Sequence, residues 1–165
     1  MTLTAFVLYG LLYALLGSLA LLLIALNGPR LMLEDYPKQI SQAVAPKTKA
    51  ERQRLNWVGI PFVAILVGFP LLVGLIQARQ DHADFWTIMR IVWGLMLFFN
   101  VYDLLVIDWL IVCFITPKIV VIPGTEGNLG YKNYWFHFIG FLKGTGITFL
   151  ISSLISLLIN YMVMT

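Results

Sequence analysis

The chain is poor in charged residues and in the side chains that build metal sites. Only 12% of its 165 residues are Asp, Glu, Lys or Arg, whereas these make up about a quarter of a soluble domain. The single cysteine, Cys113, excludes an internal disulfide and a cysteine metal cluster. The two histidines, His82 and His137, have no second histidine at ligand spacing, so we expect no metal and no cofactor. A weak metal site at His82, Asp81 and Asp84 is the alternative to a solvated loop.

Apolar residues are abundant instead, at 60% of the sequence with a mean hydropathy of +0.88. A helix needs about 20 apolar residues to cross the roughly 30 Å hydrocarbon core of a membrane. Four segments meet this requirement: residues 4–26, 57–77, 91–115 and 140–164, the last with a start as early as Tyr134. The sequence therefore predicts one transmembrane domain, residues 1–165, folded as an all-α bundle of four transmembrane helices.

Basic residues are concentrated in two of the three loops. They are Arg30, Lys38, Lys47, Lys49, Arg52 and Arg54 in the loop 27–56, and Lys118 and Lys132 in the loop 116–139. In the loop 78–90, Arg79 and Arg90 are offset by two aspartates. The positive-inside rule therefore predicts that the loops 27–56 and 116–139 are cytoplasmic and that both termini lie outside. It also explains the net charge of +3, so we expect a lipid bilayer as partner and no nucleic acid.

Local signals indicate that the two cytoplasmic loops are structured. Residues 37–46 have apolar positions at helical spacing, which predicts a short interfacial helix. Thr48 and Glu51 match a capping box, so a basic helix is expected to start there and continue into the second span. Residues 118–122 are β-branched and predict a short extended segment, followed by turns at Pro123-Gly124 and Gly127.

Two aspartates lie inside the third span. A carboxylate in a membrane span costs about 2.5–3.5 kcal/mol on insertion scales and usually faces a bundle interior or a cavity. On an α-helix, Asp108 would lie about 140° round the axis from Asp103, while Asn100 and Asp103 would occupy adjacent strips. We interpret Asp103, oriented by Asn100, either as a protonatable or cation-binding group or as a neutral residue that locks the span into the bundle.

Asp108 has a possible ionic partner on the fourth span. Spans three and four are antiparallel, so the sequence favours a structural pair between Asp108 and Lys143, with snorkelling of Lys143 to the headgroups as the alternative. His137 is interpreted as an aromatic-belt residue or as an acid/base group near Asp108. Glu126 would join an enzymatic site only if its loop folded back onto the membrane.

Small and polar residues recur at every fourth position in two spans. These rows are Gly10, Ala14 and Ser18 in the first span, and Gly140, Gly144, Thr148, Ser152, Ser156 and Asn160 in the fourth. Such rows let helix backbones approach closely, and hydroxyl groups add hydrogen bonds across the contact. The simpler hypothesis is that they pack spans one and four within one bundle; the sharper one is a homodimer interface.

Three segments carry a resemblance to a family. They are residues 34–38 (Glu-Asp-Tyr-Pro-Lys), Asp103 with residues 108–110 (Asp-Trp-Leu), and residues 116–127, which begin Thr-Pro-Lys. The chain is similar in these features to small bacterial membrane proteins with four spans. The resemblance implies a bacterial cytoplasmic membrane as the setting, and it implies no activity.

Three functional hypotheses follow from the sequence. The leading one is a non-enzymatic protein that acts by association, as a homo-oligomer or as a subunit of a larger membrane complex. The alternative is a small proton- or cation-coupled transporter or channel that uses Asp103. The third is a membrane-embedded enzyme with Asp108, His137 and Glu126 at a cytoplasm-facing site, and no activated nucleophile supports it.

Overall fold

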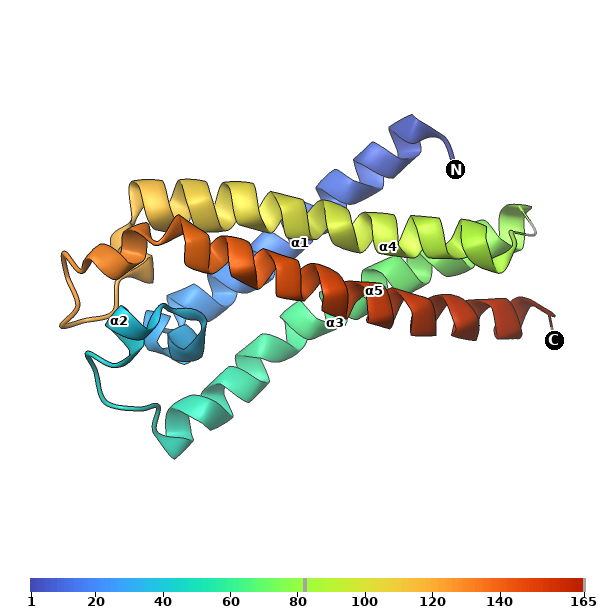
Figure 1. Ribbon diagram of the computed structural model, residues 1–165. Coiled ribbons are helices and arrows are strands. Elements are labelled where there is room, and N and C mark those ends of the chain that lie inside the picture. Colours follow the sequence, from blue (N-terminus) through green and yellow to red (C-terminus); the bar gives the residue numbers. More distant parts are fainter. Residues whose placement is uncertain (82, 165) are drawn as a thin grey trace.

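A computed structural model describes residues 1–81 and 83–164 (Figure 1). Within these residues the chain is helical and contains no strand. Its long helices are α1 (Leu3–Leu26), α3 (Lys49–Asp81), α4 (Phe85–Tyr102) continued by the π-helix η2 (Asp103–Ile115), and α5 (Tyr134–Met164). All four are long and apolar enough to cross a membrane. The predicted all-α fold class is confirmed, and the chain has the character of a multi-pass membrane protein. His82, the centre of the alternative metal site, lies outside the described residues.

The two predicted basic loops fold together at one end of the bundle, and both termini lie at the other end (Figure 1). We call residues 27–48 and 116–133 the cap. The cap contains the 3-10 helices η1 (Pro29–Asp35), η3 (Lys118–Val120) and η4 (Leu129–Lys132) and the four-residue helix α2 (Lys38–Ser41). The predicted interfacial helix at 37–46 is thus shorter than expected, with Pro37 as its N-cap.

A small apolar core holds the cap together. Its buried residues are Leu33, Tyr36, Ile40, Ile122 and Tyr131. The Tyr36 hydroxyl donates to the Val120 carbonyl at 2.8 Å, and the Tyr131 hydroxyl accepts from the Ile122 N–H at 2.8 Å. The first of these bonds joins the two loops, as does the bond from Asn128 Nδ2 to the Gln39 carbonyl at 3.0 Å, and the second fixes the loop 116–139 on itself. The cap is therefore a structured unit formed by both loops.

The extended segment predicted at 118–122 is wrong. These residues begin with the 3-10 turn η3, in which the Val120 N–H donates to the Pro117 carbonyl at 3.0 Å. No strand lies beside them in the described part of the chain, so β-branched residues gain no ladder there. The turns that follow are as expected, since Gly124 and Gly127 both adopt positive φ.

Local capping explains where the long helices begin. The Thr48–Glu51 capping box is confirmed: the Glu51 carboxylate accepts from the Thr48 N–H at 2.7 Å, and Thr48 Oγ1 accepts from the Glu51 N–H at 3.2 Å. Helix α3 therefore starts in the basic segment and continues as one helix of 33 residues. At the start of α5, Asn133 Oδ1 accepts from the Phe136 N–H at 3.0 Å. This cap sets the earlier of the two starts that the sequence allowed.

Helix α4 packs against both α1 and α5. A Cβ built on Gly17 of α1 would lie 2.4 Å from the Phe99 ring of α4, so only glycine permits this approach. Ser18 of the same helix contacts the Tyr102 hydroxyl at 3.4 Å. Tyr13 is fully buried, stacks on Phe69 of α3 at 5.2 Å, and donates to the Leu66 carbonyl at 2.8 Å. The small-residue row of α1 thus faces α4 and not the fourth span.

The row on α5 also faces α4. Thr148, Ser152 and Ser156 are buried, and Thr148 Oγ1 accepts from the Asn100 amide at 3.2 Å. The Ser152 and Ser156 hydroxyls contact the sulfur atoms of Met96 and Met89 at 3.2 and 3.7 Å. Both rows therefore contact α4 and serve packing within the bundle. The buried part of the α5 row is consequently not on the surface for a second copy, although Gly140 is exposed.

Replacing Ser152 by leucine is expected to destabilise the bundle by about 1–3 kcal/mol, because the larger side chain overpacks the contact with Met96. Ser153→Leu is the matched control, since Ser153 bonds only its own helix, at the Phe149 carbonyl, and is only part-buried. The control should stay within about 0.5 kcal/mol of the parent. Helicity during unfolding by SDS in mixed micelles measures both. Equal losses in the two variants would contradict the α4–α5 contact described above.

Candidate functional site

The cap-side half of the third span is a π-helix. Its hydrogen bonding changes at Asp103, and the segment continues to Ile115, where the Thr116 N–H donates to the Ile111 carbonyl at 2.8 Å. A π-helix joins residues five apart, so these residues stack along one face as residues four apart do in an α-helix. Asp103 and Asp108 are five apart and therefore share a face. The predicted separation of about 140° is wrong because it assumed an α-helix.

A lysine from the cap closes the end of the π-helix. Lys132 Nζ donates to the carbonyls of Cys113 and Phe114 at 2.5 and 3.0 Å and to Thr116 Oγ1 at 2.8 Å. An ammonium group is favourable here because the last carbonyls of a helix have no partners and carry partial negative charge. Thr116 itself adopts a positive φ of 50°, which is strained for a β-branched residue. Lys132 thus fixes both the helix end and the turn into the cap.

Asp108 pairs with His137 and not with Lys143. Its Oδ1 lies 3.0 Å from His137 Nδ1, and the His137 side chain is buried. Helix α5 begins at Tyr134, whose carbonyl accepts from the Trp109 indole N–H at 3.3 Å, so its first turn is level with Asp108. Lys143 lies further along α5, is exposed, and makes no ion pair among the described residues. His137 therefore lies beside Asp108, the position that its predicted acid/base role requires.

Asp103 is half-buried and takes part in none of the hydrogen bonds or ion pairs among the described residues. The predicted bond from Asn100 is absent, since the Asn100 amide donates to Thr148 on α5 instead. The charges close to Asp103 are those of Asp108 on its own helix and Asp35 in the cap. Asp103 thus has neither a hydrogen-bond donor nor a cationic partner among the described residues.

Asp35 is a member of this group that the sequence did not reveal. It ends η1, and although its carboxyl keeps accessible surface, the surrounding protein excludes enough water to raise its pKa. Lys47 partly offsets this rise, whereas the charges of Glu34 and Asp108 add to it. We call Asp35, Asp103, Asp108 and His137 the acidic cluster. Only tertiary folding of the cap brings Asp35 to it, so no local pattern could have found it.

Other predicted groups lie outside the acidic cluster. Glu126 is exposed and accepts from the Gly124 N–H at 3.0 and 3.1 Å, so it caps its own turn. In the part of the chain that the structure describes, no three His, Cys, Asp or Glu side chains converge as metal ligands do. Searches of family models, of curated proteins and of solved structures found no match to this chain.

Replacing Asp35 by asparagine should stabilise the protein at neutral pH. The folded-state pKa of Asp35 is raised above its ordinary value of about 3.9, so the folded state binds protons more readily than the unfolded state. Stability therefore falls as pH rises through this window, and D35N avoids the loss. Thermal unfolding in detergent at pH 7 and pH 4 measures the effect, and the advantage of D35N should vanish at the lower pH.

The neighbouring residue provides a control of opposite sign. A hydrogen bond from Lys47 lowers the pKa of Glu34, so its ionised form stabilises the fold at neutral pH and this contribution is lost on acidification. E34Q should therefore unfold at a lower temperature than the parent at pH 7 and match it at low pH. A destabilised D35N at pH 7 would show that the Asp35 carboxylate is favoured by its surroundings.

Proposed function

We propose that the protein is a proton-coupled membrane carrier in which Asp103 is the titrating group. The observation that carries this proposal is Asp103 itself: it has no hydrogen bond or ion pair among the described residues, it shares the third span with the Asp108–His137 pair, and it lies within electrostatic reach of Asp35 in the cap. An ionisable group inside a membrane span is by default a candidate for transport, and proton relays are commonly made of Asp, Glu and His.

The chemistry of the acidic cluster suits proton exchange. Proton relays in membrane proteins are commonly built from aspartate and histidine side chains in contact, and His137 lies 3.0 Å from Asp108. Asp35 is exposed on the cap and is the natural point of exchange with water. The Asp108–His137 pair is then the step between Asp35 and Asp103.

The remainder of the third span favours a carrier over an open channel. Beyond Asn100, toward the terminal end, the packed face of the third span is mainly apolar, with Leu95, Met96 and Phe99 buried, and the Ser152 and Ser156 hydroxyls of α5 contact methionine sulfur atoms there. A continuous water path would need a row of polar groups free to bind water. Asp103 would instead bind a proton on the cap side and release it after a change in helix packing.

The two other hypotheses have lost support. Association rested on the small-residue rows and on the basic loops, and the buried members of the rows are used within the chain on α4. The enzyme hypothesis rested on Asp108, His137 and Glu126, and the last of these caps a turn. We place the proposed carrier in a bacterial cytoplasmic membrane, with the basic cap in the cytoplasm and both termini outside.

Replacing Asp103 by asparagine should abolish transport. In proteoliposomes with an internal pH dye, the parent protein should dissipate an imposed pH gradient faster than empty vesicles, and D103N should match empty vesicles. Asp103→Glu, which keeps a titratable group, should retain measurable flux. Circular dichroism and size-exclusion chromatography check that each variant is folded.

Glu126→Gln is the matched control, since it removes an exposed carboxylate outside the acidic cluster and keeps an acceptor for Gly124. Its flux should equal that of the parent. Parent vesicles no faster than empty ones, or full flux in D103N, would each refute the proposed function.

A further inference from the structure

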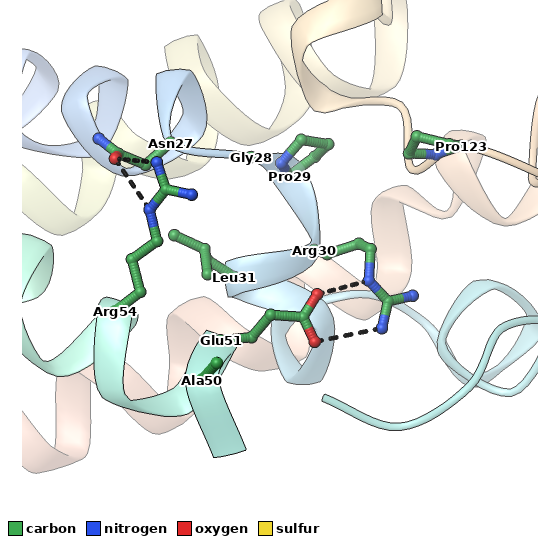
Figure 2. Close-up of a pocket in the computed structure, with 9 residues that line it drawn as sticks. All are labelled: Asn27, Gly28, Pro29, Arg30, Leu31, Ala50, Glu51, Arg54 and Pro123. Atoms are coloured by element: carbon green, nitrogen blue, oxygen red, sulfur yellow. Dashed lines mark hydrogen bonds and ion pairs between the residues drawn. The ribbon is translucent and has the colours of Figure 1, made fainter. Parts of the chain in front are cut away.

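A separate cavity of about 310 Å³ opens where α1 ends and α3 begins. Figure 2 shows Arg54 and Arg30 on opposite sides of it, with Leu31 and Glu51 between them. Apart from Asn27, the rest of its lining is glycine, proline and alanine, so the walls are largely apolar. None of its lining residues belongs to the acidic cluster.

The two arginines of this cavity differ in whether an acidic side chain neutralises their charge. Arg30 forms an ion pair with Glu51, with Nε–Oε1 at 2.7 Å and Nη2–Oε2 at 3.4 Å, so its charge is neutralised (Figure 2). Arg54 donates from Nε and Nη2 to one neutral acceptor, Asn27 Oδ1, at 3.2 and 2.8 Å. No acid pairs with Arg54 in the described chain, so the cavity carries a net positive charge.

The guanidinium group of Arg54 is held in place and still has donors to offer. The Asn27 amide nitrogen donates to the Leu23 carbonyl at 2.9 Å, which turns Oδ1 toward Arg54. A guanidinium has five N–H donors in a planar fork, and the bonds to Asn27 leave Nη1 unused. A fork fixed in advance loses little conformational freedom when it binds a phosphate.

The cavity lies at the level of a membrane interface. Asn27 is the C-cap of α1, the residue at which that apolar helix ends. Trp57 follows Arg54 on α3 and is 71% exposed, and tryptophans of this kind sit among lipid headgroups. Just beyond these residues, Leu26 and Ile60 are exposed and offer apolar surface for acyl chains.

From this geometry we infer that the cavity binds the headgroup phosphate of an anionic phospholipid, with Arg54 as the phosphate ligand. Arg54 donates to the phosphate oxygens, as arginine does with planar acceptor groups of this kind. The uncompensated charge selects an anionic headgroup over a zwitterionic one, because the cationic part of the latter would face Arg54. The exposed apolar surface at Leu26 and Ile60 selects a lipid over a free phosphate ion.

Native mass spectrometry of the full-length protein in detergent tests this site. Phosphatidylglycerol should bind more tightly than phosphatidylcholine, and Arg54→Gln should weaken phosphatidylglycerol binding about tenfold, as loss of a charge-assisted contact does. Arg52→Gln is the matched control: Arg52 is exposed, lies two residues away and carries the same charge. It should lose only the general attraction between a basic residue and an anionic lipid, so its binding should stay close to that of the parent.

A second variant separates geometry from charge. Asn27→Ala keeps every charge but removes the acceptor that holds Arg54, so it should also weaken phosphatidylglycerol binding. The affinity of the Arg52→Gln variant is the reference for this comparison. Circular dichroism confirms folding. Equal binding by the Arg54 and Arg52 variants would overturn the site, as would equal affinity for the two lipids. Displacement of the lipid by equimolar inorganic phosphate would assign the cavity to the free ion and overturn the lipid proposal.

Discussion

The change from α-helix to π-helix at Asp103 determines where the polar groups of this protein lie. Because a π-helix joins groups five residues apart, Asp103 and Asp108 lie close to one line along the helix, whereas on an α-helix they would be about 140° apart. A π-helical segment of 13 residues is long for a structure that mostly occurs as single turns. Its end is held from outside, by Lys132 on the carbonyls of Cys113 and Phe114. The geometry of the acidic cluster therefore depends on the cap.

The two aspartates of the third span differ in the charged groups around them. Asp108 faces His137 at 3.0 Å, so its charge has a partner when the imidazole is protonated. Asp103 has neither a donor nor a cation near it among the described residues, and its closest charges are acidic. A lone ionised carboxylate in such surroundings is costly, and a buried group commonly responds by binding a proton. Asp103, which has no hydrogen bond or ion pair among the described residues, is thus the aspartate whose proton can change without breaking a contact of the bundle.

Much of the architecture could be predicted from the sequence because it depends on local signals. Twenty apolar residues, a capping box at Thr48 and Glu51, and glycines in a turn are each sufficient to define an element. The partner of each helix could not be predicted this way. Spans one and four carry similar small-residue rows, and only the position of α4 between them decides what each row contacts.

The candidate site was predictable only in part, for the same physical reason. The presence of Asp103 and Asp108 in an apolar span marked the location, but the angle between them depended on a helix type that sequence periodicity does not report. Asp35 and Lys132 come from loops whose composition is simply polar, and the fold of the cap brings them to the third span. Pairing with Lys143 failed because an earlier start of α5 moved His137 to the level of Asp108.

The short helix η1 connects the two polar sites at the cap end. Leu31 lines the arginine cavity, and its carbonyl accepts from Lys47 Nζ at 2.8 Å. Lys47 is buried, pairs with Glu34, and its charge lowers the pKa of Asp35 four residues after Leu31. One buried lysine therefore contacts the lining of the arginine cavity and also acts electrostatically on the acidic cluster. Because Coulomb interactions weaken with distance, the effect of Lys47 on Asp35 depends on the position at which the Leu31 carbonyl and Glu34 hold its ammonium group.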